Sequence, residues 1–296
     1  MMTHQMKIAV FDDYRLGVID GLHVCDISGL VEDRWRGHPL AINRLIECWG
    51  EVRDQAVRLA RTAKPKRLDE VRLLPPLPQP RQLFAAPLNY HQHITEMGSS
   101  PHVPGGLPAE QTSREMGFFV KASGSICGPS DAIELPSWQG RVFHHECELG
   151  VVIGRTARAT TRPHAREHVF GYTCLIDVTM RMNQEFQEER PMRKSFETFT
   201  PIGPWIVTAD EVPDPNGLSI RLWVNDELRQ DDSTARMIVG VDELIERASA
   251  VVTMHPGDVY ATGTPAGVGP IGPGDRVRIW IERVGEFTIP VRQRDW

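Results

Sequence analysis

Short apolar runs bounded by glycine, proline and polar residues recur along the chain and predict a mainly β protein. The first three, Ile8–Phe11, Leu16–Ile19 and Leu22–Ile27, are separated by turn signals and predict a small β-meander. Further runs of this kind predict the strands of the main domain. They are Leu83–Ala86, Phe118–Val120, Leu149–Ile153, Tyr172–Val178, Pro204–Val207, Leu218–Val224, Val259–Thr262, Val277–Ile281 and Phe287–Val291.

Helical spacing of apolar residues is confined to a few segments. These are Pro39–Thr62, Pro163–Val169, Thr179–Glu188 and Val241–Val252. The proline-rich segment Leu74–Pro80 can continue neither a helix nor a central strand. We therefore expect a domain boundary there, between a small N-terminal α/β unit (residues 1–75) and the main domain (residues 76–296). The fold class predicted by these patterns is α+β, mainly β.

Composition narrows the class of partner. Of 296 residues, 41% are hydrophobic and 24% are charged, which is ordinary for a soluble globular protein. The net charge of −6 and the lack of a Lys/Arg block argue against a nucleic acid or an anionic membrane as partner. No signal peptide or membrane-spanning run is recognisable, so a cytoplasmic location is expected. The five scattered cysteines indicate reduced packing residues. A small-molecule ligand is the best prediction.

Two carboxylates, Glu146 and Glu148, stand at the start of an apolar, β-branched run. Side chains alternate along a strand, so both carboxylates should point to one face and Cys147 to the other. Paired carboxylates repel each other unless they share a proton or a cation, and oxygen ligands favour Mg²⁺, Mn²⁺ or Ca²⁺. His144 or His145 keeps a softer metal conceivable. The alternative is a strand that begins at the surface with both glutamates solvated.

Four further segments carry candidate chemistry. His93 and Glu96 are three residues apart, on one face if helical, and a carboxylate that orients an imidazole suits a general base. Asp177 ends an apolar run and could be either a functional acid or a helix cap. Lys194 precedes an aromatic stretch. The glycine-rich segment 260–269 could bind an anion through its N–H groups or simply join two strands.

Between Glu96 and Phe118 lies a stretch rich in glycine, proline and polar residues. Its low periodicity predicts either a lid over a site or a surface loop.

Five segments between about Pro80 and Val291 resemble the fumarylacetoacetate hydrolase family in their residue patterns and in their order along the chain. The segments are Asn89–Glu96, Glu146–Leu149, Gly171–Arg181, Lys194–Pro204 and Thr262–Gly269. The resemblance implies a mixed β-sandwich roll, a homodimer and a divalent ion, usually Mg²⁺ or Mn²⁺. It implies that Glu146, Glu148 and Asp177 hold the metal and that His93, Glu96 and Lys194 are catalytic. The substrate-binding residues expected are Tyr90, Arg181, Gln184, Gly263 and Thr264.

Three departures from the family pattern bear on the substrate. Glu197 replaces the usual aspartate, Met182 follows Arg181 where aspartate is usual, and Ala86–Leu88 precedes Asn89 where a glycine-containing segment is common. None of them removes an expected metal ligand. They leave the identity of the substrate open, because pocket residues tune such a site.

The first functional hypothesis is hydrolysis of a C–C bond in a 2,4-dioxo acid of the acylpyruvate or fumarylpyruvate type. The substrate would be a small-molecule 2-oxo acid, and the products would be pyruvate and a carboxylic acid. The second is isomerisation or decarboxylation of unsaturated 2-oxo acids or oxaloacetate in aromatic-acid breakdown. A third, of another class, is a metal-stabilised binding protein without turnover. The base and the cation expected beside the metal argue against this third hypothesis, because a structural ion requires neither.

Overall fold

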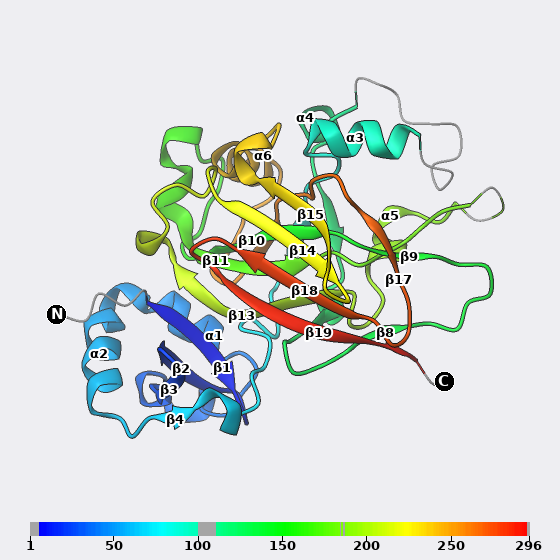
Figure 1. Ribbon diagram of the computed structural model, residues 1–296. Helices are drawn as coiled ribbons and strands as arrows, with labels where there is room; N and C mark the ends of the chain where they lie inside the picture. The colour runs from blue at the N-terminus through cyan, green and yellow to red at the C-terminus, as the bar shows by residue number, and fades with distance from the viewer. Residues whose placement is uncertain (1–5, 100–110, 184, 186, 295–296) are drawn as a thin grey trace.

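The structure of the protein, a computed structural model, describes residues 6–99, 111–183, 185 and 187–294. Within these residues the strands form three sheets (Figure 1). The largest sheet has the spatial order β4 (Lys66–Arg67), β3 (His23–Asp26), β2 (Arg15–Asp20), β1 (Lys7–Phe11), β13 (Thr200–Thr208), β11 (Val169–Ile176), β10 (Cys147–Ile153), β16 (Val259–Ala261), β5 (Leu83–Ala85) and β6 (Phe119–Lys121). Strand β7 (Ile126–Cys127) also pairs with β13.

Two smaller sheets and a few helices complete the described chain. The second sheet has the order β15 (Glu227–Ser233), β14 (Ser219–Val224), β18 (Arg276–Ile281), β19 (Gly285–Gln293) and β8 (Ile133–Leu135). The third has the order β12 (Thr179–Met180), β9 (Phe143–His145) and β17 (Gly269–Ile271). The helices are α1 (Ala41–Glu47), α2 (Trp49–Thr62), α3 (His91–Gly98), α4 (Ser113–Met116), α5 (Arg190–Lys194) and α6 (Val241–Val251).

The main core lies between the largest sheet and the second sheet. Leu149 and Val151 of β10 belong to one buried cluster with Leu222 of β14 and Ile279 of β18. Figure 1 shows β14, β18 and β19 lying over the strands β10, β11 and β13. The predicted mainly β, sandwich-like fold is therefore confirmed.

The N-terminal helices α1 and α2 pack against the other face of the largest sheet, to which the N-terminal strands β1 to β4 themselves belong. Ile42 and Leu45 of α1 share a buried cluster with Val152 and Leu175 of the central strands. Strand β10 is therefore buried on both faces, which explains why it carries no polar side chain after Glu148. The meander β1–β2–β3 is confirmed, and β1 also pairs antiparallel with β13. The boundary at residue 75 remains a prediction.

Replacing Trp49 of α2 with alanine tests how strongly the N-terminal unit is attached. The Trp49 ring meets Phe170 of β11 edge-on, with 5.5 Å between centroids. Losing this packing should lower the free energy of unfolding by about 2 kcal/mol, because the tryptophan is only partly buried. Chemical denaturation measures this loss, and Leu22→Ala, at a leucine that is 69% exposed, is the control. Equal effects of the two substitutions would contradict the expectation.

The predicted helices differ from the observed ones in three places. Pro39–Thr62 forms two helices, because Cys48 between α1 and α2 has φ −102° and ψ 9°. Arg162–His168 is a 3₁₀ helix, and Val169 already begins β11. Periodicity detects apolar faces, and neither a one-residue break nor a tighter helical turn disturbs those faces strongly.

The helix predicted over Thr179–Glu188 is wrong. Thr179 and Met180 form β12 and pair with His144 and Phe143 of β9, and the next helix, α5, begins only at Arg190. Pairing with β9 overrides the local helical preference because both residues of β12 become buried there. Gln184 lies outside the described residues.

The segment predicted as a lid or a loop, Glu96–Phe118, is described only in part. It contains the end of α3 and the short helix α4, whose Thr112 and Glu115 form a capping box. Residues 100–110 of the segment lie outside the described residues. Among the residues that the structure describes, no helix is both long and apolar enough to cross a membrane.

Candidate active site

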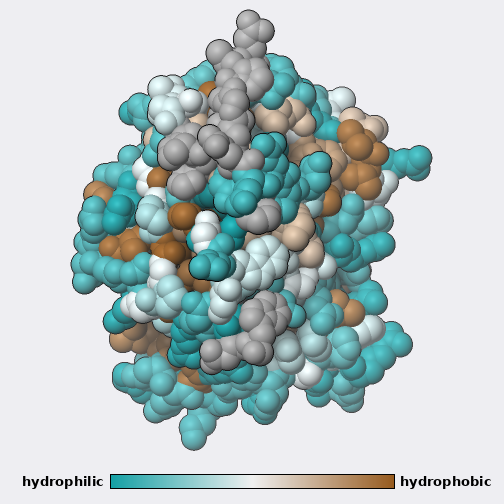
Figure 2. All heavy atoms as spheres, turned by 90° about the vertical axis from the view of Figure 1, so that its right-hand side faces the viewer, coloured by the Kyte–Doolittle hydropathy of each residue, from teal (hydrophilic) through white to brown (hydrophobic). Residues whose placement is uncertain are grey.

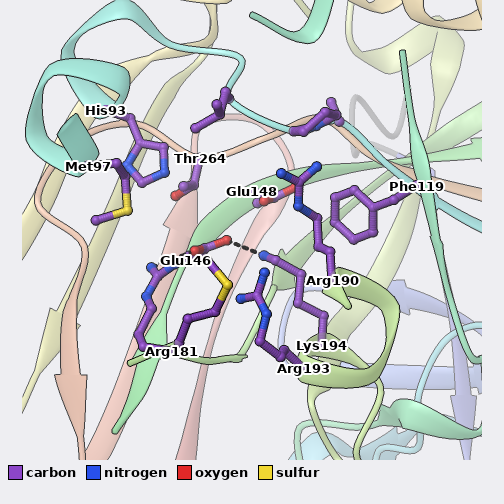
Figure 3. A pocket seen from close by; sticks show the side chains of 14 residues that line it. His93, Met97, Phe119, Glu146, Glu148, Arg181, Arg190, Arg193, Lys194 and Thr264 are labelled. Carbon is purple, nitrogen blue, oxygen red and sulfur yellow. Dashed lines mark hydrogen bonds and ion pairs between the residues drawn. The ribbon is translucent and has the colours of Figure 1, made fainter. Parts of the chain in front are cut away.

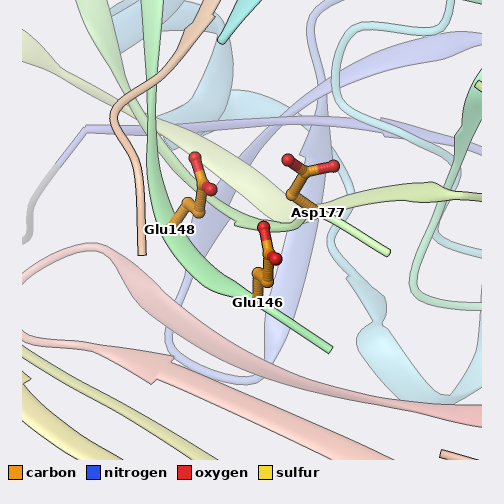
Figure 4. Close-up of side chains that lie close together, drawn as sticks. All are labelled: Glu146, Glu148 and Asp177. Atoms are coloured by element: carbon orange, nitrogen blue, oxygen red, sulfur yellow. The ribbon is translucent and has the colours of Figure 1, made fainter. Parts of the chain in front are cut away.

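Three carboxylates meet where strand β10 begins and its antiparallel neighbour β11 ends. Glu146 lies between β9 and β10, Glu148 is in β10, and Asp177 follows β11. The pairing of Cys147 with Ile176 and the hydrogen bond from Asp177 N–H to Glu146 C=O (2.8 Å) place the first and third opposite each other. One oxygen from each carboxylate lies within 4.8 Å of the others, and all three side chains are buried (Figure 4). Cys147 packs into the core.

Cationic side chains surround these carboxylates. Lys194 Nζ lies 2.6 Å from Glu146 Oε2 and 2.5 Å from Asp177 Oδ2, while Arg181 Nη2 lies 2.7 Å from Glu146 Oε1. Lys121 Nζ donates to Asp177 Oδ1 (2.5 Å) and to the carbonyl of Phe199 (2.9 Å). Burial opposes ionisation of Glu146, but the charges of Lys194 and Arg181 outweigh it and hold the pKa of Glu146 well below its usual range.

Glu148 has a different environment from Glu146. Its Oε2 accepts a hydrogen bond from Gly263 N–H (2.7 Å). Burial and the neighbouring negative charges of Asp177 and Glu146 raise the pKa of Glu148 well above its usual range. A divalent cation among the three carboxylates would relieve this repulsion, and the donor set consists of hard oxygen ligands. The residues therefore fit Mg²⁺, Mn²⁺ or Ca²⁺.

His93 and Glu96 lie on one face of α3. His93 Nδ1 lies 3.1 Å from Glu96 Oε2, and Gly267 N–H donates to Glu96 Oε1 (3.0 Å). Although burial acts in the opposite direction, these two contacts lower the pKa of Glu96. A carboxylate can only accept, so the Nδ1 of His93 carries the proton and its Nε2 is left as the proton acceptor.

The glycine-rich segment holds both acidic groups from one side. Gly263 and Gly267 donate to Glu148 and Glu96 respectively, so these two N–H groups are already engaged. The side chain of Thr264 faces the cavity, where its hydroxyl accepts a hydrogen bond from Gln230 Nε2 (2.8 Å). The segment therefore positions two carboxylates of the protein itself. The sequence had suggested only that its N–H groups could bind an anion.

Gly263→Ala tests this role of the segment. Gly263 has φ +91°, and a Cβ there would lie 2.6 Å from the Cβ of Asn89. We expect the substitution to displace the N–H from Glu148, to weaken Mn²⁺ binding and to destabilise the fold by more than about 1 kcal/mol. Metal titration and thermal unfolding measure these effects. Gly50→Ala, at an open position of α2, is the control. Unchanged Mn²⁺ affinity would contradict the expectation.

A cavity of about 90 Å³ connects these groups. Six predicted site residues line it (Figure 3), namely His93, Glu146, Glu148, Arg181, Lys194 and Thr264. Glu96 and Asp177 stand behind them in direct contact with His93 and Lys194. Tyr90 does not line the cavity. It is 1% exposed, and its hydroxyl has no hydrogen-bond partner among the described residues.

Two of the three departures from the family pattern also line the cavity. Met182 and the segment Ala86–Leu88 contribute to its wall. Glu197, in contrast, is exposed and forms an ion pair with Arg294. The first two departures are therefore in positions to affect which substrate fits.

Sequence reasoning missed four residues of this region: Phe119, Lys121, Arg190 and Arg193. Phe119, Arg190 and Arg193 line the cavity. A charged residue at the end of a predicted apolar strand was the available signal for Lys121. The two arginines belong to α5, which was not predicted, and no motif in the sequence marked them.

The exterior on this side of the molecule is predominantly polar. Figure 2 shows the face that lies to the right in Figure 1, where α3 and α5 are found, and its hydrophobic residues form separate groups. Such a surface suits the approach of a charged small molecule.

Comparison with known proteins identifies relatives over nearly the whole chain. The model of the fumarylacetoacetate hydrolase C-terminal domain matches residues 82–292. A maleylpyruvate hydrolase from Aquipseudomonas alcaligenes is 41% identical and is covered over 99% of its length by 97% of this chain.

Solved structures agree with the sequence comparison. Maleylpyruvate hydrolase from Sphingobium sp. SYK-6, in complex with manganese(II) and pyruvate, is 38% identical, with a TM-score of 0.84 over 98% of this chain and 100% of that one. A 2-hydroxyhepta-2,4-diene-1,7-dioate isomerase from Mycobacterium marinum is 30% identical, with a TM-score of 0.73 over 98% of this chain and 100% of that one. The family match, the full-length relatives and the shared fold confirm the resemblance, and the chain belongs to the fumarylacetoacetate hydrolase family.

Proposed function

We propose that the protein is a divalent-metal-dependent hydrolase that cleaves a C–C bond in an acylpyruvate, a 2,4-dioxo acid, to release pyruvate and a carboxylic acid. The observation that carries the proposal is one cavity whose wall joins a buried three-carboxylate group to His93 and Lys194. Two similar proteins are maleylpyruvate hydrolases, and one was solved with manganese and pyruvate. Turnover also explains a base beside the carboxylates, which a binding protein does not need.

Glu146, Glu148 and Asp177 would hold the metal, Mg²⁺ or Mn²⁺ with Ca²⁺ as an alternative. Such an ion supplies Lewis-acid polarisation of the 2-oxo acid and positive charge near the enolate of the leaving pyruvate.

The side chains of the protein perform the remaining steps. His93 Nε2 accepts a proton from water, while Glu96 fixes the imidazole through Nδ1 and stabilises its charged form. The resulting hydroxide attacks the C4 carbonyl of the substrate. As the C3–C4 bond breaks, its electron pair passes to C3, and C4 leaves in the carboxylic acid product. Lys194 places a positive charge beside the developing enolate, and the enolate takes up at C3 the proton that His93 accepted, which returns His93 to its neutral form.

Arg181 and Thr264 orient substrate oxygens in this proposal, as do Tyr90, Gln184 and Gly263 by family resemblance. The structure supports Arg181 and Thr264 most directly, because both line the cavity. For Gly263 the supporting observation is its hydrogen bond to Glu148. Tyr90 could act only through its neighbours, since it is buried outside the cavity wall.

The proposal is tested by assaying maleylpyruvate, acetylpyruvate, oxaloacetate and an unsaturated 2-oxo acid with the same preparation. We expect the acylpyruvates to be cleaved to pyruvate, activity to disappear with EDTA, and Mg²⁺ or Mn²⁺ to restore it. Saturating metal should also raise the melting temperature, since 100 times Kd corresponds to about 2.7 kcal/mol. Isomerisation or decarboxylation without acylpyruvate cleavage would replace this function by the second candidate, which the isomerase relative favours. No turnover on any substrate would overturn both.

The proposal extends to assembly and location. The family resemblance supports a homodimer, and light scattering of the purified protein tests it. A cytoplasmic location, expected from the sequence, is tested by cell fractionation.

A further inference from the structure

The cavity wall contains three arginines, and only one of them pairs with a carboxylate of the three-carboxylate group. Arg181 pairs with Glu146, whereas Arg193 donates to the backbone carbonyls of Glu188 (2.8 Å) and Met180 (3.3 Å). Arg190 forms no ion pair with any described carboxylate. Its guanidinium carbon lies 5.4 Å from the centre of the Phe119 ring. Arg193 is therefore engaged by backbone carbonyls, whereas Arg190 has neither a hydrogen-bond acceptor nor an ion-pair partner among the described residues.

The charges around the cavity leave a positive surplus. Four carboxylates, Glu96, Glu146, Glu148 and Asp177, lie in or directly behind the cavity wall with five cationic side chains, so one positive charge remains before any metal binds. The cations are Lys121, Arg181, Arg190, Arg193 and Lys194. A divalent ion would add to this surplus. An acylpyruvate with one carboxylate balances less of it than one with a second carboxylate at its acyl end.

The crowding of the guanidinium groups leads to the same conclusion. Burial, and then the charges of Arg190 and Arg181, lower the pKa of Arg193 to about 10. The Nε of Arg181, a residue that is 8% exposed, has no hydrogen-bond partner among the described residues. Like charges and unused donors around one cavity are costly unless a bound anion compensates them.

The position of Arg190 suits such an anion. Figure 3 shows Arg190 between Glu148 and Phe119, on the opposite side of the cavity from His93 and Arg181. Phe119 attracts the guanidinium, because a cation over a ring face is stabilised by it, and Lys194 Nζ lies 5.5 Å from the centre of the same ring. A planar guanidinium can then offer two parallel N–H donors to one carboxylate.

We propose that Arg190, oriented by Phe119, binds the second carboxylate of the substrate and makes the protein selective for acylpyruvates whose acyl group ends in a carboxylate. This inference rests on the proposed acylpyruvate hydrolysis and names its substrate class and the residue that selects it.

The test compares two substrates and three variants of the metal-loaded protein. Maleylpyruvate carries the second carboxylate and acetylpyruvate lacks it. Arg190→Gln should lower kcat/KM for maleylpyruvate by about 10- to 100-fold, mainly through KM, and leave acetylpyruvate unchanged. Arg190→Lys should restore part of the loss because it retains the charge. Arg58→Gln, at an exposed arginine of α2, is the matched control and should change neither substrate.

Equal loss on both substrates in Arg190→Gln, or no loss on either, would overturn the proposal. Calorimetry with maleate, the dicarboxylate product, separates it from the proposed function. We expect the wild type to bind maleate at least about 10-fold more tightly than Arg190→Gln. If the wild type cleaves neither substrate yet shows this difference, hydrolysis fails and the dicarboxylate subsite stands. If the two proteins bind maleate equally, the subsite fails even where hydrolysis is observed.

Discussion

Glu148→Gln is expected to remove most of the affinity for divalent metal and to lower kcat/KM by more than about 10²-fold. Glutamine has nearly the same shape and can still accept the hydrogen bond from Gly263, so the local fold should persist. It lacks the charge that, with Glu146 and Asp177, forms the buried three-carboxylate group. Calorimetric titration with Mn²⁺ and steady-state kinetics at saturating Mg²⁺ measure the two effects.

A matched substitution separates this effect from a general loss of charge. Glu70→Gln removes a carboxylate from an exposed position, and we expect it to change neither metal affinity nor kcat/KM. Thermal unfolding of Glu148→Gln without metal should match or exceed that of the wild type, because a buried, repelling charge is gone. Undiminished Mn²⁺ affinity in Glu148→Gln would remove Glu148 from the metal site.

His93→Gln is expected to lower kcat by about 10²- to 10⁴-fold while leaving Mn²⁺ affinity unchanged. A glutamine on α3 can still reach Glu96, but it cannot accept a proton from water. The contrast with Glu148→Gln is diagnostic, because only one of the two substitutions should affect metal binding. Stopped-flow measurement of acylpyruvate cleavage, together with metal titration, provides both values.

The control for this substitution lies on the same helix. His91→Gln changes an exposed histidine one half-turn earlier and should leave kcat unaltered. If His93→Gln kept the activity of the wild type, another group would have to deliver the water. A loss of cleavage with retained isomerisation of an unsaturated 2-oxo acid would show that His93 serves water delivery alone.

Local patterns predicted much of the fold. The meander, most central strands and α6 follow from apolar runs and turn residues, because alternation and helical period are properties of the backbone alone. The same reasoning was wrong over Thr179–Glu188, where pairing with β9 took precedence. It also joined α1 and α2, since the break at Cys48 leaves the apolar face nearly continuous.

Some residues of the candidate site follow from spacing along the chain, and others are brought together only by strand pairing. Glu146 and Glu148 lie near each other because they are two residues apart, and His93 meets Glu96 because they are one helical turn apart. Asp177 was a candidate acid from its position after an apolar run, but its assignment as a metal ligand came only from the family resemblance. Its position opposite Glu146 arises from the pairing of β10 with β11.

The sequence by itself therefore determined the strand-rich architecture, the acidic pair, the histidine–glutamate pair and, through its ordered segments, the family. Only the tertiary structure decided that Lys121 contacts Asp177 from 56 residues away and that Arg190 shares a cavity wall with Phe119. The reason is physical. Spacing along the chain fixes which neighbouring side chains share a face, whereas strand pairing and packing fix which distant charges are buried together.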